Sequence, residues 1–287
     1  MSLEPTVQGV GSSLPRTIWF LWLQGREEMP WAVRRCCVSW EVRNPGWDFV
    51  FLDRETLAEY LIEQIASASP SFLTMQAYSD AIRVNLLREY GGVWVDATCF
   101  CSKPLDSWIA PQVSEGFFAF RSPGGRRLLS SWFLAATRNS YVVECYAEAV
   151  NRYMAIEGLK DSLCLDMEQR LIRFLELINV PNSFLVSSFF SKLTRKYPYF
   201  WFHYIFESLY LHDAEFRRAW DLVPHYSADG PHGILFHGIY EEADGPIKDE
   251  IDQGIVPLYK LVWDIDTNRL TESCAINYLL DTLHEER

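Results

Sequence analysis

Three short apolar runs in the first hundred positions predict buried β-strands. They are Thr17–Leu23, Asp48–Asp53 and Val93–Asp96, and each is rich in β-branched and aromatic residues. A continuous apolar run of this length is typical of a strand covered on both faces, as in a parallel sheet. Asp96 ends the third run, and ligands of α/β sheets bind at the carboxyl ends of strands.

Segments with helical spacing separate these runs. One helix is expected to begin at Pro30, because proline suits the first turn of a helix. Two further helices are predicted over Thr56–Ala66 and Gln76–Tyr90, and Gly91-Gly92 stops the second of them. The order strand–helix–strand–helix–helix–strand is that of the opening of a nucleotide-binding α/β domain.

The rest of the chain predicts one more strand, over Gly116–Phe120, and a helical part. Helices are expected over Tyr141–Ile156, Ser162–Ile178 and Tyr199–His212. No repeat, low-complexity segment or linker divides the sequence. We therefore expect a loose tail over residues 1–14 and a single α/β domain over 15–287, with a mixed central sheet and a helical insertion at roughly 140–215.

Composition and charge narrow the class of protein. The 287 residues can bury a sizeable core, and the shares of hydrophobic (49%) and charged (22%) residues are ordinary for a soluble protein. A net charge of −12 argues against a general nucleic-acid binder, which needs a basic face. An acidic protein that binds a nucleotide diphosphate must supply positive charge locally, from a metal ion, an Arg or Lys, or a helix N-terminus.

The cysteines and the N-terminal sequence point to an ordinary cytoplasmic protein. None of the seven cysteines has zinc-site spacing, and no C-x-x-C occurs, so reduced, buried thiols are expected. No basic segment precedes an apolar stretch, and Thr17–Leu23 is too short to cross a membrane.

Three charged residues are the candidates for chemistry. Asp80 and Arg83 lie three positions apart and share a helix face, although many helices carry such pairs on their surface. Asp96 ends a strand that should be buried, where an unpaired carboxylate is costly. A metal ion, an arginine or ligand hydroxyls would explain it. The adjacent Gly91-Gly92 turn allows a ligand to approach the backbone closely.

The segment Ser79–Asp96 has the pattern Ser-Asp-x-x-Arg-x-x-x-Leu-x-x-Tyr-Gly-Gly-Val-Trp-Val-Asp. It resembles the glycosyltransferases with a sugar-binding DXD region, and more closely their capsular polysaccharide synthesis branch. Further matches follow in order along the chain, in segments that begin at Ile18, Cys37, Ser130, Trp201 and Pro257. Ordered matches over most of a chain are a stronger signal than one motif. The resemblance implies a GT-A-type, Rossmann-like fold and a nucleotide-sugar donor.

The resemblance also implies roles for individual residues. Asp80 and Arg83 would hold the transferred sugar and its phosphate. Asp96 would open the DXD element, which holds the sugar or ribose and a metal-bound diphosphate. Trp19 or Trp22 would stack on the base, with core packing as the alternative for each.

The sequence departs from DXD at Thr98, where the second Asp is expected. A hydroxyl is a weaker ligand for a hard cation than a carboxylate. The implied Mn²⁺ or Mg²⁺ would therefore be held by Asp96, Thr98, the diphosphate and a later residue, for which His232 and His237 are candidates. Lys260 is a candidate for neutralising the diphosphate, with an ordinary surface lysine as the alternative.

The implied reaction is transfer of a hexose, with a UDP-sugar favoured, to a glycan or lipid-linked oligosaccharide in cell-surface polysaccharide synthesis. Retention of configuration is expected, because the family usually retains it. His203 could face this acceptor, although a core histidine is the preferred interpretation. Because a lipid-linked acceptor would lie at the membrane, peripheral attachment of the protein to the inner face of the membrane also stays open. Two alternatives also stay open: a binding protein of the same fold that lost turnover, and a toxin-like protein glucosyltransferase.

Overall fold

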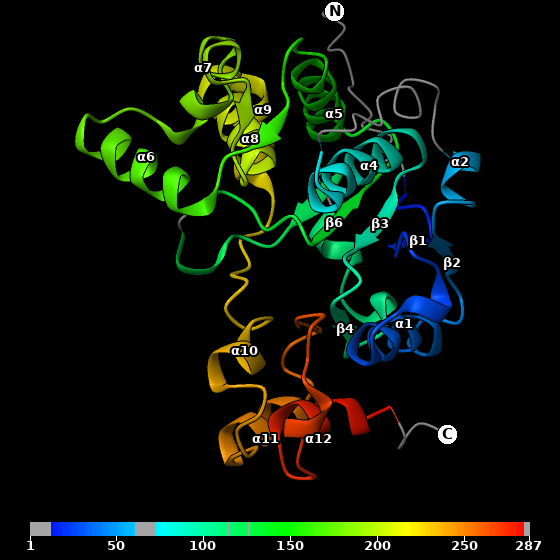
Figure 1. Cartoon of the computed structure of the whole chain (residues 1–287). Coiled ribbons are helices and arrows are strands. Elements are labelled where there is room, and N and C mark those ends of the chain that lie inside the picture. Colours follow the sequence, from blue (N-terminus) through cyan, green and yellow to red (C-terminus); the bar gives the residue numbers. More distant parts are fainter. Residues whose placement is uncertain (1–12, 61–72, 114, 126, 284–287) are drawn as a thin grey trace, which may run out of the picture.

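The computed structural model describes residues 13–60, 73–113, 115–125 and 127–283 (Figure 1). A five-stranded sheet in the order β2-β1-β3-β6-β5 lies at its centre. Its strands are β1 (Thr17–Leu21), β2 (Asp48–Leu52), β3 (Gly92–Val95), β5 (Phe117–Ala119) and β6 (Phe133–Ala136). β1 is parallel to both β2 and β3, whereas β6 is antiparallel to both β3 and β5. The predicted α/β class with a mixed sheet is confirmed.

Four of these strands match the sequence prediction closely, and β6 was not predicted. Residues Phe133–Ala136 are buried on every side and show no alternation of polar and apolar residues. Two of the four are alanines, which have little preference for strands. The pairing of β6 with its two neighbours stabilises this short run as a strand, and such long-range pairing is invisible in local sequence.

Helices α1 (Trp31–Arg43), α2 (Leu57–Tyr60), α4 (Met75–Tyr90) and α5 (Tyr141–Met154) surround the sheet. The end of the predicted helix Thr56–Ala66 lies outside the described residues. Thr74 caps α4 by accepting a hydrogen bond from the backbone N–H of Ala77, and Gly91 ends the helix with φ 67°. Short 3₁₀ turns link the elements: η1 (Arg26–Glu28), η2 (Leu105–Ser107), η3 (Ala110–Val113), η4 (Pro123–Gly125), η5 (Asn182–Val186) and η6 (Thr267–Arg269).

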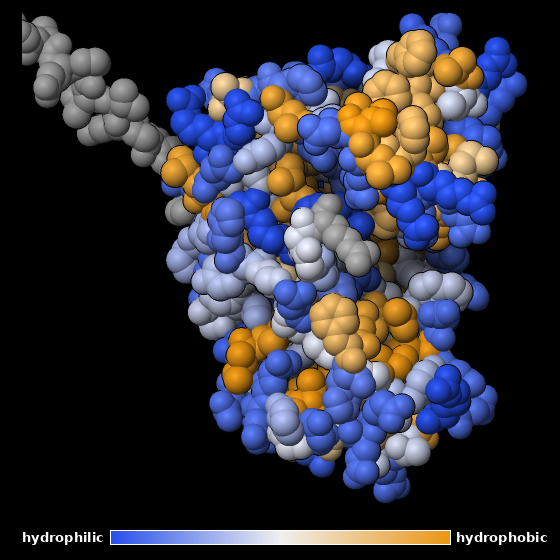
Figure 2. Space-filling model, turned by 90° about the vertical axis from the view of Figure 1, so that its left-hand side faces the viewer, coloured by the Kyte–Doolittle hydropathy of each residue, from blue (hydrophilic) through white to orange (hydrophobic). Residues whose placement is uncertain are grey.

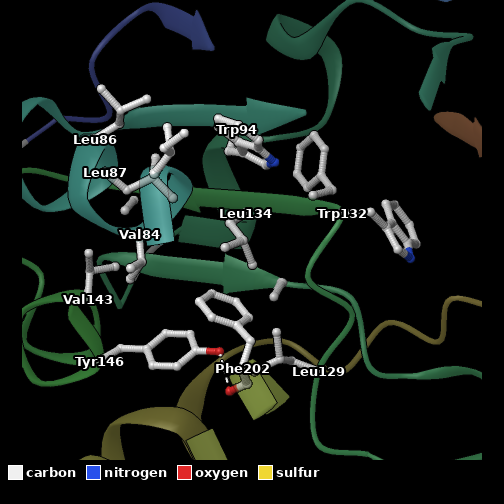
Figure 3. Packing of buried hydrophobic residues seen from close by; sticks show 14 of the residues in the cluster. Val84, Leu86, Leu87, Trp94, Leu129, Trp132, Leu134, Val143, Tyr146 and Phe202 are labelled. Atoms are coloured by element: carbon white, nitrogen blue, oxygen red, sulfur yellow. Dashed lines mark hydrogen bonds between the residues drawn. The ribbon is translucent and has the colours of Figure 1, made fainter. Parts of the chain in front are cut away.

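The apolar face of α4 packs into the main core of the protein. Figure 3 shows Val84 and Leu87 of this helix close to Leu134 of β6, and all three belong to one buried cluster. The cluster also includes Tyr146 of α5, whose hydroxyl donates a 2.8 Å hydrogen bond to the carbonyl of Phe202. This packing fixes α4 against the sheet, so side chains on its next face are held near the strand ends.

The remaining helices form a lobe beside the sheet and a separate C-terminal cluster (Figure 1). The lobe contains α6 (Leu165–Leu177), α7 (Ser188–Thr194), α8 (Trp201–His212) and α9 (Ala214–Leu222). The short parallel strands β7 (Asp161–Ser162) and β8 (Lys196–Tyr197) flank α6 and α7 in sequence.

The C-terminal helices are α10 (Gly233–His237), α11 (Gly245–Asp252) and α12 (Ala275–Asp281), and they build a second hydrophobic core. Strand β9 (Leu258–Lys260) leaves this cluster to pair antiparallel with β4 (Cys99–Cys101). This pairing brings the distant Lys260 next to the end of β3.

Two further sequence predictions concern the whole chain. All seven cysteines carry free thiols, as expected, although Cys164 is exposed and Cys145 is only partly buried. Within the ranges described above, none of the helices combines the length and the apolar character that crossing a bilayer requires.

Candidate active site

A cleft of about 770 Å³ opens at the carboxyl ends of β1 and β3. This volume suits a ligand of the size of a nucleotide sugar. The lining side chains include both predicted acids, the arginine between them, and residues from the lobe and the C-terminal cluster. Those used below are Trp22, Asp80, Arg83, Asp96, Thr98, Arg127, Trp132, His203, His232 and Lys260.

Arg83 is the centre of the site. Its Nη2 atom lies 3.3 Å from Oδ1 of Asp80 and 3.2 Å from Oδ1 of Asp96. Nη1 donates a 2.6 Å hydrogen bond to the carbonyl of Ser131, while Nη2 donates to Oγ of Ser79 at 2.9 Å. The guanidinium is 5% exposed. Five fixed donors allow arginine to hold several oxygens at once, so this side chain sets the geometry of both carboxylates.

Asp96 is held at the strand end by its neighbours as well. Its Oδ1 accepts a 2.9 Å hydrogen bond from the indole N–H of Trp94, and its backbone N–H donates to the carbonyl of Trp132 at 2.8 Å. The carboxylate stays 26% exposed at the cleft. It can therefore still accept hydrogen bonds from ligand hydroxyls.

Asp80 is more deeply buried, with a side chain 14% exposed. Burial raises the pKa of its carboxyl from 3.8 to about 7, against the opposing effect of Arg83 and with a further rise from the charge of Asp96. The indole N–H of Trp201 lies near the Asp80 carboxyl and opposes the rise of its pKa, because it favours the charged carboxylate. The two groups are not in hydrogen-bonding geometry. Perturbed carboxyls of this kind concentrate at functional sites.

Lys260 reaches the site from β9. Its ammonium donates a hydrogen bond to the hydroxyl of Thr98 and lies 4.0 Å from Oδ2 of Asp96. Thr98 is buried, at 8% exposure. The lysine therefore lies directly beside Asp96 and Thr98, two of the residues that were predicted to bind a metal ion.

The histidines separate into two environments. His232 lines the cleft, where its Nδ1 lies 2.8 Å from the carbonyl of Ala228, and burial lowers the pKa of its ring. His203 also lines the cleft, and burial followed by the charges of Arg127 and Arg83 lowers its pKa well below 6.5, so both rings are neutral at pH 7. His237, the predicted metal ligand, is not among the lining residues, and its Nε2 lies 2.9 Å from the carbonyl of Glu242.

The two candidate tryptophans also differ. Trp19 is 2% exposed, donates from its indole N–H to the carbonyl of Gly91 at 2.8 Å, and packs against Tyr60 and Tyr90. It is a core residue and does not line the cleft. Trp22 lines the cleft and is the better candidate for stacking on a base.

The residues at the end of β3 do not fit a divalent metal ion. Both oxygens of Asp96 already face cations, since Arg83 lies beside Oδ1 and Lys260 beside Oδ2. The hydroxyl of Thr98 accepts from the same lysine. In the described part of the chain, no three His, Cys, Asp or Glu side chains come together as a metal-binding group. An added divalent ion at Asp96 would meet the positive charges of both Arg83 and Lys260.

Arg127 and Trp132 are among the side chains of the cleft that the sequence analysis did not single out. Arg127 lines it with its guanidinium 4.0 Å from the centre of the Phe200 ring. Trp132 stacks on Phe120 and meets the ring of His232 edge-on. Both follow the Ser122–Gly125 turn, a loop without a recognisable motif. Trp132 lies in the family-matching segment that begins at Ser130, but that match did not indicate a site role, and Arg127 had no signal beyond the basic character of the segment.

Comparisons with known proteins agree with this geometry. The family of capsular polysaccharide synthesis proteins matches residues 8–161, more than half of the chain. O-glycosyltransferase braB of Annulohypoxylon truncatum is 27% identical over 153 residues, covering 46% of this chain and 36% of that protein. Inositol phosphoceramide mannosyltransferase 1 of Schizosaccharomyces pombe is 26% identical over 150 residues, covering 50% and 45%. Glycosyltransferase afumC of Aspergillus fumigatus is 30% identical over 161 residues, covering 48% and 40%.

The match to these relatives spans less than half of their length. Among solved structures, the PaToxG glycosyltransferase matches 51% of this chain and 64% of its own, at 14% identity and a TM-score of 0.37, which is too low to support an argument. The family match includes the helix and the strand end that bring Asp80, Arg83 and Asp96 together. The chain therefore belongs to the capsular polysaccharide synthesis protein family.

Proposed function

We propose that this protein is a glycosyltransferase that transfers a hexose from a nucleotide-diphosphate sugar, with a UDP-sugar favoured. The observation that carries the proposal is the cluster of Asp80, Arg83 and Asp96, which lies at the strand ends in a cleft of suitable size. Carboxylates beside a guanidinium can bind sugar hydroxyls and a phosphate oxygen at the same time. The names of all three relatives describe glycosyl or mannosyl transfer.

The proposed donor lies along the cleft with its base against Trp22 and its sugar near Asp80. Positive charge for the diphosphate comes from Arg83, Arg127 and Lys260, which all line the cleft. As the bond from C1 to the phosphate oxygen breaks, its electron pair remains on the diphosphate. Fixed cations in a partly desolvated cleft stabilise that developing charge.

We propose retention of configuration by attack on the face from which the diphosphate leaves. The acceptor oxygen bonds to C1, and its proton passes to the departing phosphate oxygen. Within the described ranges, the carboxylates that line the cleft are Glu28, Asp80 and Asp96. Arg83 engages the two aspartates, which makes each a weaker nucleophile for a covalent sugar intermediate.

An amphiphilic acceptor, such as a lipid-linked oligosaccharide of a cell-surface polysaccharide, suits the lobe next to the cleft. Apolar side chains are exposed on α6, η5 and α7, with Leu177 at 85%, Leu193 at 70% and Phe189 at 67%. Figure 2 shows hydrophobic residues gathered on this side of the molecule. Exposed bases lie among them, namely Arg170, Arg173, Lys192 and Arg195. Apolar residues with a basic surround favour an anionic membrane surface over free solution.

Vesicle flotation tests the acceptor side. We expect the protein to float with phosphatidylcholine vesicles that contain phosphatidylglycerol, and the double variant Phe189→Ser/Leu193→Ser to remain unbound. Val42→Ser removes an exposed apolar side chain from α1 and should float like the wild type. Equal flotation of all three proteins would show that the apolar residues of the lobe do not bind the membrane.

Donor turnover tests the reaction itself. Purified protein is incubated with UDP-, GDP- and CMP-sugars, and release of the nucleotide is followed with and without candidate acceptors. Asp96→Asn should lower turnover of the preferred donor at least about 100-fold, since it removes a charge from the reacting centre. Asp249→Asn, a matched change at an exposed position of α11, should leave it unchanged. Saturable nucleotide binding without any turnover would favour a binding protein instead. Thr98 is the feature that supports this alternative, because it replaces the second Asp of the DXD element.

A further inference from the structure

We infer that the ammonium group of Lys260 takes the place of a divalent metal ion, so that side-chain cations alone bind the diphosphate of the donor. The inference rests on the proposed function, because it assumes that a nucleoside diphosphate enters the cleft. It differs from the expectation of Mn²⁺ or Mg²⁺ that the DXD resemblance carries.

The backbone fixes the position of this lysine. Lys260 pairs with Cys99 across β4 and β9, and its N–H donates to the carbonyl of Pro231 at 2.8 Å. The next residue, Leu261, donates to the carbonyl of Thr98 at 2.7 Å. The side chain is 19% exposed, unlike that of an ordinary surface lysine. The ammonium is therefore held at the end of β3 by a strand and not by a flexible loop.

Two side-chain cations already occupy the cluster. Asp80 and Asp96 contribute two acidic groups, and Arg83 and Lys260 contribute two permanent cations within 4.0 Å of them. A divalent ion at Asp96 would have to displace the ammonium or accept its repulsion. Replacement of the second DXD carboxylate by Thr98 agrees with this arrangement, because a neutral hydroxyl accepts the hydrogen bond that Lys260 donates.

A diphosphate brings negative charge that the two side-chain cations can help to neutralise. When it enters, Lys260 can turn one N–H toward a phosphate oxygen and keep its hydrogen bond to Thr98, since an ammonium has three donors. Arg127 lines the same cleft and adds a third side-chain cation to Arg83 and Lys260. Lysine and arginine then supply the positive charge that a metal ion supplies elsewhere.

The first test is calorimetric titration of UDP into the full chain, after treatment with EDTA and again with added Mn²⁺. We expect the two dissociation constants to agree within about twofold. Binding that requires Mn²⁺ would overturn the inference and leave the proposed function intact. Absence of binding by UDP and GDP under both conditions would overturn the inference and the proposed donor together.

Variants test the role of the lysine directly. Lys260→Met should weaken UDP binding at least about tenfold, and Mn²⁺ should not restore it. Lys248→Met removes a lysine of α11 that faces the ring of Tyr278, away from the cleft, and should bind like the wild type. Thermal unfolding of both variants checks that they fold. Wild-type affinity in folded Lys260→Met would overturn the inference.

A designed metal site provides an independent test. The double variant Thr98→Asp/Lys260→Met replaces the cation with a second carboxylate, so that the site gains the charge a divalent ion needs. Its UDP binding should depend on Mn²⁺ by about tenfold or more. If Mn²⁺ does not change UDP binding by this variant, the argument from charge is wrong.

Discussion

Arg83 and Asp96 form a 3.2 Å ion pair between a helix and the end of a strand that follows it in the sequence. The Gly91-Gly92 turn separates the two elements and reverses the chain between them. The pair therefore ties α4 to β3 at the point where a ligand enters. Stability and ligand binding depend on the same guanidinium, and the two effects can be measured separately.

Replacement of Arg83 by methionine should destabilise the protein by about 3–5 kcal/mol, because it leaves the buried Asp80 without its cation and removes one of the two cations beside Asp96. Urea unfolding measures this loss. Arg88→Met on the same helix breaks an exposed pair with Glu144 and should cost less than about 1 kcal/mol. Equal losses in the two variants would show that the buried pairs of Arg83 contribute no more than a surface pair.

The raised pKa of Asp80 predicts a specific pH dependence of stability. The folded carboxyl keeps its proton up to about pH 7, whereas in the unfolded chain it releases the proton near 3.8. Between these values the folded state binds more protons, so the free energy of unfolding falls as pH rises. Relative to Asp80→Asn, which cannot ionise, the wild type should lose stability between about pH 4 and pH 7. If the free energies of unfolding of the two proteins, measured in urea, change with pH in parallel, the pKa of Asp80 is not raised.

Much of the donor side of the site was predictable because its residues lie in one segment. Asp80 and Arg83 share a helix face, and a glycine pair returns the chain to a strand that ends at Asp96. The spacing of residues within this one helix–turn–strand segment was therefore enough to predict that the three side chains lie close together. The structure brings these three residues together as the motif predicts.

Lys260, His232 and Arg127 could not be placed from periodicity, because long-range contacts position them. Lys260 reaches the site through a strand pairing with β4, and no alternation in its short segment indicates the partner. Sequence also could not choose between His232 and His237, which are five positions apart, since the direction of each ring depends on how α10 packs.

Trp22 and Trp19 should respond differently to replacement by alanine. Loss of Trp22 should weaken UDP binding about tenfold, because stacking of a base on an aromatic ring contributes about 1–3 kcal/mol. Loss of Trp19, buried and hydrogen-bonded to Gly91, should instead cost about 3–5 kcal/mol of stability. Calorimetric titration and urea unfolding of both variants separate the effects. Unchanged UDP affinity in Trp22→Ala would exclude that indole as the base platform.

His232 and His237 provide a similar comparison. The Nδ1 of His232 faces the carbonyl of Ala228, which leaves Nε2 of the neutral ring to accept a hydrogen bond in the cleft. His232→Ala should lower kcat/KM for donor turnover about tenfold, in keeping with one lost hydrogen bond. His237→Ala should stay within twofold of the wild type. A larger effect at His237 would restore it as the ligand that the sequence suggested.

Gly92 should tolerate no side chain, because it combines a left-handed backbone with close contact to β1. Its φ is 96°, and a Cβ atom there would lie 2.6 Å from the carbonyl oxygen of Thr17. Gly158 has a similar φ of 90° but open space around the same position. Gly158→Ala therefore measures the backbone strain alone, about 1–3 kcal/mol, and Gly92→Ala should cost at least about 1 kcal/mol more, since β1 must move away from β3. Urea unfolding of the two variants gives the difference. If both lose the same stability, the approach of β1 to Gly92 does not limit the residue at this turn.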